Sequence, residues 1–318
     1  MSAKIERRVE LGQHNGPELV RNSKGHAVID CRECGFAHLW PKPAAEELAE
    51  YYARNFYETH GAPDWAEKEE SEQSYWELEY ADRLAAFSEI LQKPTGKLLD
   101  VGCGGGWFLA YAQARGWEVL GIEPSQSMWQ RAASRAPVLL GTFPGVDISG
   151  HAPFDAAHVK LVMEHVSDPL EVLAAVREVL RPGGIVVVQV PNDFNPVQLA
   201  AQKLLDKDSW WVVHPVHVNY FNFESLERAL RRCGFEPQAR EATFPMEWFL
   251  LQGIDYIGRD DIGRKCHGQR MALEKNLEAG GLSEMRRGFS RWLASQGIGR
   301  EAVVYAVRSS QESGFLSH

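Results

Sequence analysis

The stretch KLLDVGCGGGWFLA, residues 97–110, decides the fold. An apolar run ends at Asp100, four glycines fall within residues 102–106, and a bulky apolar segment follows. A strand that leads through glycines into a helix presents backbone N–H groups and the positive helix end to a ligand. Glycines also let a ligand approach the main chain closely. The stretch therefore predicts a nucleotide-type ligand at this turn.

The spacing of the glycines narrows the choice of ligand. A dinucleotide-binding turn, G-x-G-x-x-G, would need its third glycine at Trp107, and a P-loop would need a Gly-Lys-Ser/Thr that is absent. Asp100 instead precedes the first glycine by two residues, where its carboxylate can accept hydrogen bonds from a cationic amine. A second acid, Glu123, ends the next apolar run, where it can accept both hydroxyls of a ribose.

The chain after residue 97 alternates between strand-like and helix-like segments. Apolar runs predict strands at 98–101, 118–122, 138–140, 156–161 and 185–190, and helices begin near residues 107, 125, 168 and 224. A sixth strand is expected within 234–244, a polar helical insertion over 268–295, and a closing strand within 300–310. Such alternation predicts an α/β fold with a mostly parallel, seven-stranded sheet and helices on both faces.

Two segments precede this domain. Residues 1–42 are predicted to form an N-terminal cysteine-hairpin module, with strand-like runs on either side of the turn CRECG. Residues 43–96 are predicted to form a helical cap of two amphipathic helices, 43–61 and 65–91. The large domain is expected over 97–318.

Composition excludes several classes of function. The chain has 318 residues and a formal charge of −9, and it lacks a dense Lys/Arg run, so we expect no nucleic-acid partner. The longest apolar run, 185–191, is too short to cross a bilayer, and the first ten residues carry no apolar signal segment. We expect a cytoplasmic protein that does not bind membranes. Its five cysteines are odd in number and sparse, which favours reduced thiols.

Four segments in the same order carry a family resemblance. They are LLDVGCGGGWFL, VLGIEPS, FDAAHVKLVMEHVSDP and LRPGGIVVVQVPN. Together they resemble the motif series of class I S-adenosylmethionine-dependent methyltransferases, over residues 97–192. The resemblance implies a Rossmann-like fold, S-adenosylmethionine (SAM) as cofactor and S-adenosylhomocysteine (SAH) as product.

The resemblance also assigns cofactor-binding positions along the chain. The implied residues are Gly102, Gly104 and Gly106 at the methionine part, Glu123 at the ribose, Pro124, Met128, Thr142 and Phe143 at the adenine, and Lys160 and Leu161 beside the cofactor. Asp100 joins them as a cofactor-binding candidate because of its place before the first glycine.

The pair Glu164-His165 follows the fourth strand directly. Related small-molecule methyltransferases carry the same pair, and in some sugar C-methyltransferases the histidine is assigned as the base. Two roles fit the pair equally: acid–base catalysis, or bracing the helix that begins near Asp168. Lys160 and Leu161 precede the pair and argue against a catalytic metal there.

A second polar cluster, WWVVHPVHVNYFNFES, covers residues 210–225. Relatives often place a histidine at the position of His217, in a loop over the acceptor pocket. Trp210 and Trp211 fit lid packing as well as ring stacking. His165 and His217 are therefore the two candidate bases, with Tyr220 as a candidate partner.

The hairpin CRECGF, with Cys31 and Cys34, resembles half of a zinc ribbon. A tetrahedral zinc site needs four ligands, and GQHNG stands where a second cysteine pair would lie. Only His14, His26 and His38 are near in sequence to supplement the pair. The favoured interpretation is a hairpin without bound metal.

The sequence favours methyl transfer from SAM to a small-molecule acceptor by in-line displacement, with a histidine as general base. The acceptor classes considered are a nucleotide sugar, a polysaccharide precursor and a secondary metabolite. Two alternatives are a non-catalytic SAM-binding or regulatory protein and a dinucleotide-dependent oxidoreductase, the latter opposed by Trp107. The sequence predicts neither the acceptor nor the oligomeric state.

Overall fold

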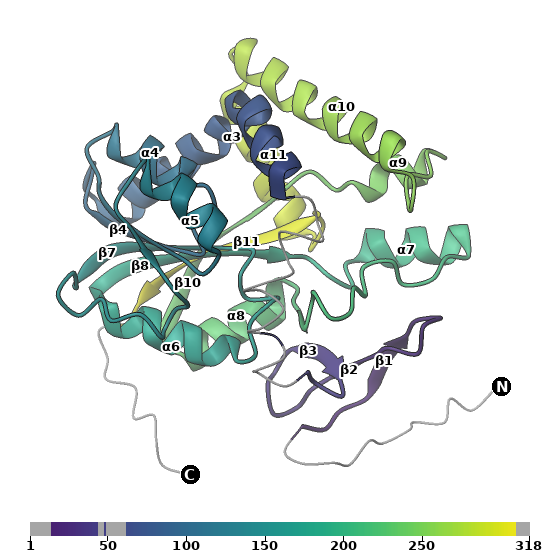
Figure 1. Ribbon diagram of the computed structural model, residues 1–318. Coiled ribbons are helices and arrows are strands. Elements are labelled where there is room, and N and C mark those ends of the chain that lie inside the picture. Colours follow the sequence, from purple (N-terminus) through teal and green to yellow (C-terminus); the bar gives the residue numbers. More distant parts are fainter. Residues whose placement is uncertain (1–13, 44–47, 49–61, 310–318) are drawn as a thin grey trace.

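The computed structural model describes residues 14–43, residue 48 and residues 62–309 (Figure 1). The helix predicted over 43–61 lies outside the described residues, apart from positions 43 and 48. The second predicted helix is present as α3, which runs from Ala62 to Leu91.

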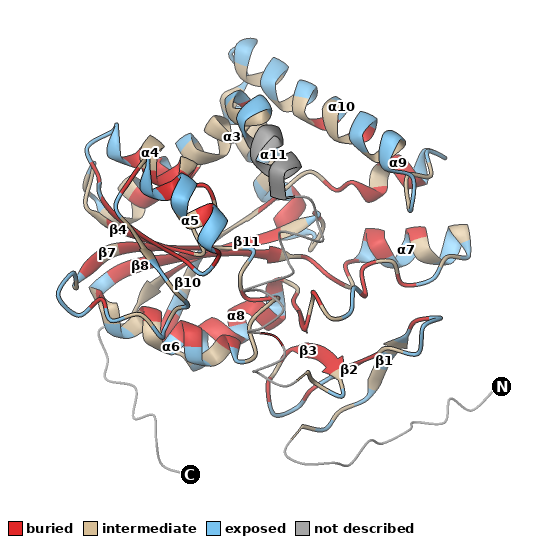
Figure 2. Cartoon of the chain, viewed as in Figure 1, coloured by how far each residue is buried: buried red, intermediate tan, exposed pale blue. Residues whose placement is uncertain are grey.

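The larger sheet of the described chain has seven strands, as predicted. The apolar strands at its centre are almost wholly buried (Figure 2), which a sheet covered on both faces requires. In the order in which they lie side by side, the strands are β10 (Phe235–Ala242), β11 (Glu301–Arg308), β8 (Leu180–Pro191), β7 (Phe154–Lys160), β4 (Lys97–Val101), β5 (Glu118–Glu123) and β6 (Val138–Leu140).

The strand directions determine where a ligand can bind. β6, β5, β4, β7 and β8 pair in parallel, whereas β11 runs antiparallel to both β8 and β10. The carboxyl ends of the parallel strands therefore meet at one edge, where ligands of open α/β sheets bind. The glycine turn after β4 lies between the end of β5 and the end of β7 at this edge.

Helices cover both faces of the sheet (Figure 1). The apolar sides of α3 and α4 pack together on one face, and α6 and α8 pack on the other. The described helices are α3 (Ala62–Leu91), α4 (Trp107–Gln113), α5 (Gln126–Ala133), α6 (Pro169–Val179), α7 (Pro196–Leu205), α8 (Phe223–Arg232), α9 (Glu247–Leu251), α10 (Asp260–Ala279) and α11 (Ser283–Ser295).

Local sequence explains where several helices begin. Ser125 accepts a hydrogen bond from the Met128 amide at the start of α5, and Asp168 accepts from two amides at the start of α6. Asn222 and Ser225 form a reciprocal capping box at the start of α8. Side chains of this type satisfy amides that the helix itself leaves unbonded, so they fix its first residue.

A separate four-stranded sheet contains the cysteine hairpin. Its order is β1 (Glu18–Arg21), β2 (Ala27–Asp30), β3 (Ala37–Trp40) and β9 (Asn219–Tyr220). The hairpin β2–β3 was predicted, but β1 and β9 were not. β9 is only two residues long and comes from the distant 210–225 segment, so the local sequence does not predict it. This pairing joins the N-terminal sheet to the edge of the large sheet.

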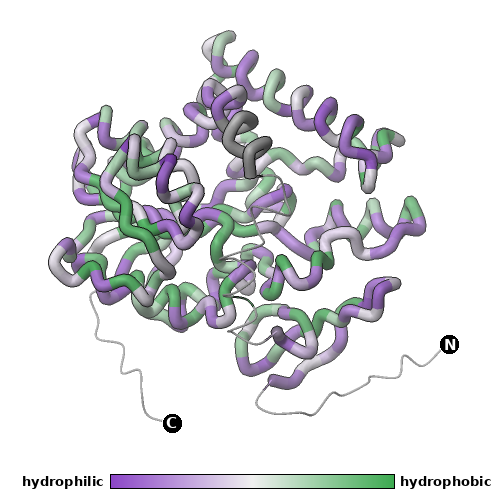
Figure 3. The backbone as a smooth tube through the Cα atoms, in the orientation of Figure 1, coloured by the Kyte–Doolittle hydropathy of each residue, from purple (hydrophilic) through white to green (hydrophobic). Residues whose placement is uncertain are grey.

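The polar insertion forms two helices, α10 and α11, and begins at Asp260, earlier than the predicted residue 268. α10 is largely hydrophilic along its length (Figure 3). It is tied to α3 by the Tyr75 hydroxyl, which donates to Glu274 at 3.3 Å. Within the described residues, none of the helices combines the length and apolarity needed to cross a membrane.

Candidate functional site

The glycine turn after β4 is closely packed at Gly102 and Gly106 and open at Gly104. Gly102, Gly104 and Gly106 have φ values of +70°, +53° and +77°, a region that side chains disfavour. A Cβ on Gly102 would lie 2.7 Å from the Val162 side chain, and one on Gly106 would lie 2.9 Å from the Ala132 main chain. A Cβ on Gly104 would meet no described atom within 4 Å. The turn therefore needs glycines for its shape and presents an open face at Gly104.

The carboxylate of Glu123 is anchored to this turn. Glu123 is 2% exposed, and its Oε2 accepts from the Gly104 amide at 2.8 Å while Oε1 accepts from the Ser125 amide at 2.9 Å. A carboxylate can accept about four hydrogen bonds in total. These two bonds therefore fix the orientation of the group without using its full capacity to accept hydrogen bonds. An acceptor for a pair of hydroxyls is thus fixed beside the open face of the turn.

Asp100 is buried at the end of β4, and its Oδ1 accepts from His158 Nδ1 at 2.7 Å. The two residues are direct neighbours in the β4–β7 register. Burial lowers the pKa of His158, which keeps its imidazole neutral. Sequence reasoning missed His158, because a histidine inside an apolar strand carries no signal of its partner.

The residues implied at the adenine lie around the ends of β5 and β6. Met128 is a buried residue of α5, Pro124 and Thr142 are exposed, and Phe143 packs against the core. The Gly141 amide donates to the Glu123 carbonyl at 3.0 Å, so the 141–143 turn lies next to the end of β5. The structure therefore brings these positions together on one side of Glu123.

Lys160 ends β7 and its side chain contacts α3. Its Nζ donates to Glu79 Oε1 at 2.6 Å and lies 4.5 Å from the centre of the Trp76 ring. Leu161 has a φ of +53° and is 36% exposed. Glu79 and Trp76 were not among the predicted site residues, because nothing in a helix sequence shows which strand end it will cover.

The turn that carries Glu164 and His165 packs against the glycine turn, since Val162 is the residue that a Cβ on Gly102 would strike. His165 Nδ1 lies 2.8 Å from the Val216 carbonyl. A carbonyl only accepts, so Nδ1 carries the proton and Nε2 has the lone pair. Glu164 Oε1 lies 3.8 Å from that Nε2.

The imidazoles of His165 and His217 meet edge to face, with ring centres 5.2 Å apart. Burial lowers the pKa of His165 to about 4. Burial and the positive charges of His165 and Arg300 lower the pKa of His217 to about 3. Both rings are therefore neutral near pH 7 and can accept a proton.

Two hydrogen-bonded links hold these histidine-bearing segments together. Asn219 Nδ2 donates to the Met163 carbonyl at 2.9 Å and to the Val166 carbonyl at 2.7 Å. Tyr220 is 1% exposed, and its hydroxyl donates to the His217 carbonyl at 3.0 Å. Tyr220 thus supports the main chain of the loop and does not bond to the imidazole.

Buried carboxyl groups surround this part of the sheet edge. Burial raises the pKa of Glu164 and of Asp193 well above the usual values, and it also raises the pKa of Glu247. In each of the three, one carboxyl oxygen makes no hydrogen bond with any described residue. Asp193 and Glu247 were not predicted from the sequence, although Asp193 lies only three residues beyond the end of the predicted fifth strand.

The tryptophans of the 210–225 segment have a packing role in this structure. Trp211 is buried in an apolar cluster with Val28, Leu39 and Tyr220. The Trp210 ring packs edge to face against Trp211, with ring centres 4.9 Å apart.

The residues Glu164, His165 and His217 lie close enough together to hold a metal ion. One ligating atom from each of them lies within 4.8 Å of the others.

Comparison with known proteins shows the family. Residues 73–239 match the model of a family described as a methyltransferase domain. The chain belongs to this family. The family match and the seven-stranded sheet confirm the resemblance to class I SAM-dependent methyltransferases and the Rossmann-like fold, and SAM, with SAH as its product, is the cofactor that this family implies.

Individual relatives of this methyltransferase-family chain match only parts of it. A ubiquinone biosynthesis O-methyltransferase of Caulobacter vibrioides is 37% identical over 169 residues, which are 49% of this chain and 64% of the relative. An uncharacterized 37.1 kDa protein in transposon TN4556 of Streptomyces fradiae is 33% identical over 139 residues, 36% of this chain and 39% of that protein. The chain thus spans less than two thirds of the length of these relatives.

Among solved structures, the plantazolicin methyltransferase BpumL in complex with SAH has a similar fold. The TM-score is 0.51 at 14% identity, over 82% of this chain and 94% of that chain. At this identity the likeness shows the fold alone.

The residues present fit SAM. The open face at Gly104 allows close approach to the main chain, and the anchored Glu123 carboxylate lies beside it to accept ribose hydroxyls. Asp100, buried near the end of β4, adds a carboxyl group at the same sheet edge, next to His158.

Proposed function

We propose that the protein transfers the methyl group of SAM to a hydroxyl group of a small molecule, with His165 as general base. One observation carries the proposal: the neutral His165 imidazole sits on a turn that packs, through Val162, directly against the glycine turn. A base next to the bound methyl donor is what an acceptor hydroxyl needs, because it must lose its proton as it attacks.

The chain's residues would hold the cofactor as follows. Glu123 would accept the ribose hydroxyls, and the glycine turn would border the methionine part beside Asp100. Met128 and the 141–143 turn would enclose the adenine. When bound, SAM supplies a sulfonium-activated methyl group, so the remaining task of the protein is to align the acceptor and exclude water.

His165 has the proton position that this chemistry requires. The Val216 carbonyl fixes the proton on Nδ1, so the lone pair on Nε2 takes the acceptor proton. The His217 ring packs edge to face against the His165 ring, with ring centres 5.2 Å apart. Glu164 Oε1 lies 3.8 Å from the same nitrogen and so borders the place at which the proton arrives.

Two features support a hydroxyl-bearing acceptor. The orphaned carboxyl oxygens of Glu164, Asp193 and Glu247 match a ligand that carries several hydroxyl groups, because buried polar atoms require partners. The Caulobacter relative, which is 37% identical over 169 residues, is named as an O-methyltransferase.

The substitution His165→Ala tests the proposal. SAM and SAH are titrated into the variant by calorimetry, and SAH release is measured with a catechol, a nucleotide sugar and a primary amine as acceptors. We expect unchanged cofactor affinity and a fall in turnover of about two orders of magnitude. The exposed His151 is the matched control, and His151→Ala should retain full turnover.

Full turnover in His165→Ala would contradict the assignment of the base and transfer it to His217. Cofactor binding without SAH release for any acceptor class would favour a non-catalytic SAM-binding protein. Binding of NAD(H) in place of SAH would favour an oxidoreductase.

A further inference from the structure

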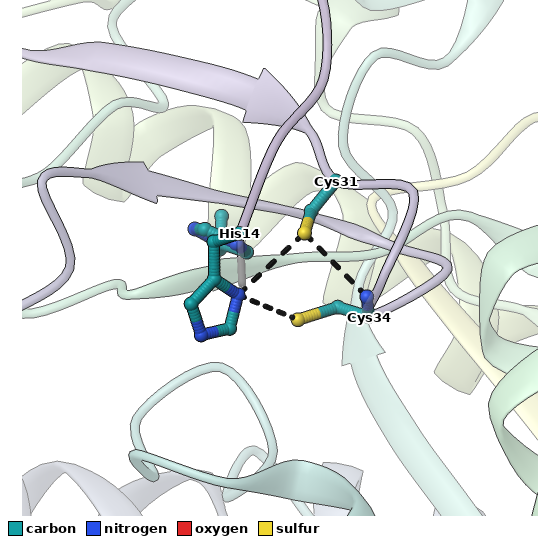
Figure 4. Close-up of side chains that lie close together, drawn as sticks. His14, Cys31 and Cys34 are labelled. Atoms are coloured by element: carbon teal, nitrogen blue, oxygen red, sulfur yellow. Dashed lines mark hydrogen bonds between the residues drawn. The ribbon is translucent and has the colours of Figure 1, made fainter. Parts of the chain in front are cut away.

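We propose that His14, Cys31, Cys34 and His38 form a structural zinc site that fixes the N-terminal sheet and, through it, the loop that carries His217. One ligating atom from each of the four residues lies within 4.8 Å of all the others. Figure 4 shows His14 beside the thiols of the hairpin turn. Two sulfurs and two imidazole nitrogens are a donor set that zinc prefers in tetrahedral structural sites.

The separations between these donor atoms match those around a tetrahedral ion. His14 Nδ1 lies 3.6 Å from Cys31 Sγ and 3.4 Å from Cys34 Sγ (Figure 4). With Zn–S bonds of about 2.3 Å and Zn–N bonds of about 2.0 Å, tetrahedral geometry places nitrogen and sulfur ligands about 3.5 Å apart. The donors are thus spaced for an ion between them. The Cys34 amide lies 3.5 Å from Cys31 Sγ, a contact that would stabilise a thiolate.

His38 supplies independent evidence for a ligand at this place. Its side chain is fully buried, and Nδ1 donates to the Leu39 carbonyl at 2.7 Å, so Nε2 carries the lone pair. That Nε2 finds no hydrogen-bond partner among the described residues. A buried nitrogen without a partner costs free energy, and a metal ion would remove this cost. Metal-binding histidines usually donate their other nitrogen to a carbonyl or carboxylate, as His38 does.

Charge balance also favours the site. On binding Zn²⁺, the two thiols release two protons, and the resulting pair of thiolates neutralises the ion. Cys31, Cys34 and His38 are each less than a tenth exposed, and a neutral assembly is the form that such burial tolerates.

The sequence prediction of a hairpin without metal rested on the missing second cysteine pair. The fold supplies the missing donors from elsewhere. His14 precedes β1 and approaches the thiols, whereas His38 lies within β3, directly after the hairpin turn. His26, the third candidate, stacks on His214 at 4.2 Å and does not belong to the cluster.

The site is connected to the sheet edge through β9. His38 pairs with Asn219 in the β3–β9 register, and the Leu39 amide donates to the Val218 carbonyl at 2.8 Å. The Asn219 side chain in turn bonds to the carbonyls on either side of the Glu164-His165 pair. Loss of the ion would therefore loosen the main-chain segments that carry His165 and His217. This consequence for turnover rests on the proposed function, whereas the presence of the ion does not.

The test measures metal content and ligand chemistry on the full chain. Purified protein is analysed for zinc, and metal-free protein is then reconstituted with Co²⁺ alone. We expect one zinc per chain and a cobalt spectrum with sulfur-to-metal charge transfer and tetrahedral bands. In Cys34→His, which keeps four donors, the charge-transfer intensity should fall by about half, because one of two thiolates is lost.

Matched variants distinguish the loss of a zinc ligand from the loss of any cysteine or histidine in the chain. Cys233→Ser and His26→Asn leave the cluster intact and should keep one zinc per chain. Cys31→Ser and His38→Ala should lose most of the zinc and melt at a lower temperature, with the SAH affinity largely retained.

The proposal is overturned if the purified chain holds no zinc and the metal-free chain binds no Co²⁺ with charge transfer. A Cys31–Cys34 disulfide in freshly purified protein would also overturn it. Zinc content does not depend on turnover, so failure here is distinguishable from failure of the proposed methyl transfer.

Discussion

We expect cofactor recognition to depend most directly on Glu123. Its two oxygens are each anchored by a backbone amide, so they face a ligand in a fixed direction. We expect Glu123→Gln to weaken SAH binding by about ten- to a hundredfold, since hydrogen bonds to a charged group contribute about 1.5–3 kcal/mol. Calorimetry measures the change. Glu118→Gln, at the exposed start of the same strand, is the control and should bind normally.

At the same scale, the buried state of His165 predicts an unusual pH profile. A general base works in its deprotonated form, and burial holds the pKa of His165 at about 4. We expect kcat/KM, measured under SAM saturation, to stay level from pH 8 down to about pH 5.5. An ordinary histidine base would lose activity below about pH 6.5. A fall centred near pH 6.5 would contradict the burial of the base.

At the scale of elements, the strand–turn–helix unit β4–α4 needs its glycines for two separate reasons. Gly106→Ala combines a positive φ with a contact of 2.9 Å to the Ala132 main chain. Gly25→Ala, in the β1–β2 turn, has a φ of +87° but meets nothing within 4 Å. The φ penalty is about 1–2 kcal/mol in both. Urea unfolding should show a larger loss for Gly106→Ala, by about 1–3 kcal/mol, because main chain must shift.

Equal losses of unfolding free energy in the two variants would mean that α5, which carries Ala132, can shift without a loss of stability. The packing of α5 on the glycine turn would then contribute little to the shape of the cofactor site.

Most elements of the large domain could be predicted from the sequence, since each has a local cause. The parallel strands are buried apolar runs, and residues such as Asp168 and Asn222 fix the helix starts. β9 could not be predicted, because it is defined only by its partner β3 far along the chain. The same holds for the contact of Glu79 in α3 with Lys160 at the end of β7.

Some residues of the candidate site could likewise be predicted from the sequence, and others could not. Positions at the carboxyl ends of parallel strands converge by topology, which is why Glu123 and the glycine turn could be paired from sequence. The partners of His158 and His38, and the orphaned carboxyl of Asp193, depend on tertiary packing that no local pattern records.

For the whole molecule, buried neutral histidines link stability to pH. The pKa of His217 is lowered by burial to about 3 in the folded chain and returns to about 6.5 on unfolding. The unfolded state therefore binds the extra proton as pH falls below 6.5, and the folded state loses stability between pH 6.5 and pH 3. By pH 5 this amounts to about 1–2 kcal/mol for this histidine.

The variant His217→Asn removes that contribution, while titrating groups that do not contact His217 act equally in both proteins. Urea unfolding at pH 7.5 and pH 5 should show that the wild type loses about 1–2 kcal/mol more than the variant over this interval. Identical losses would mean that the His217 ring is protonated in the folded chain at pH 5.

The claim that the whole molecule is a hydroxyl-directed methyltransferase is tested most directly by following the methyl group. The full chain is incubated with methyl-labelled SAM and each acceptor class, and mass spectrometry quantifies SAH and labelled product. We predict label on a hydroxyl-bearing acceptor, one product for each SAH formed, and an initial rate that falls by about two orders of magnitude in His165→Ala. SAM bound by the protein with no label transferred to any acceptor would contradict the account.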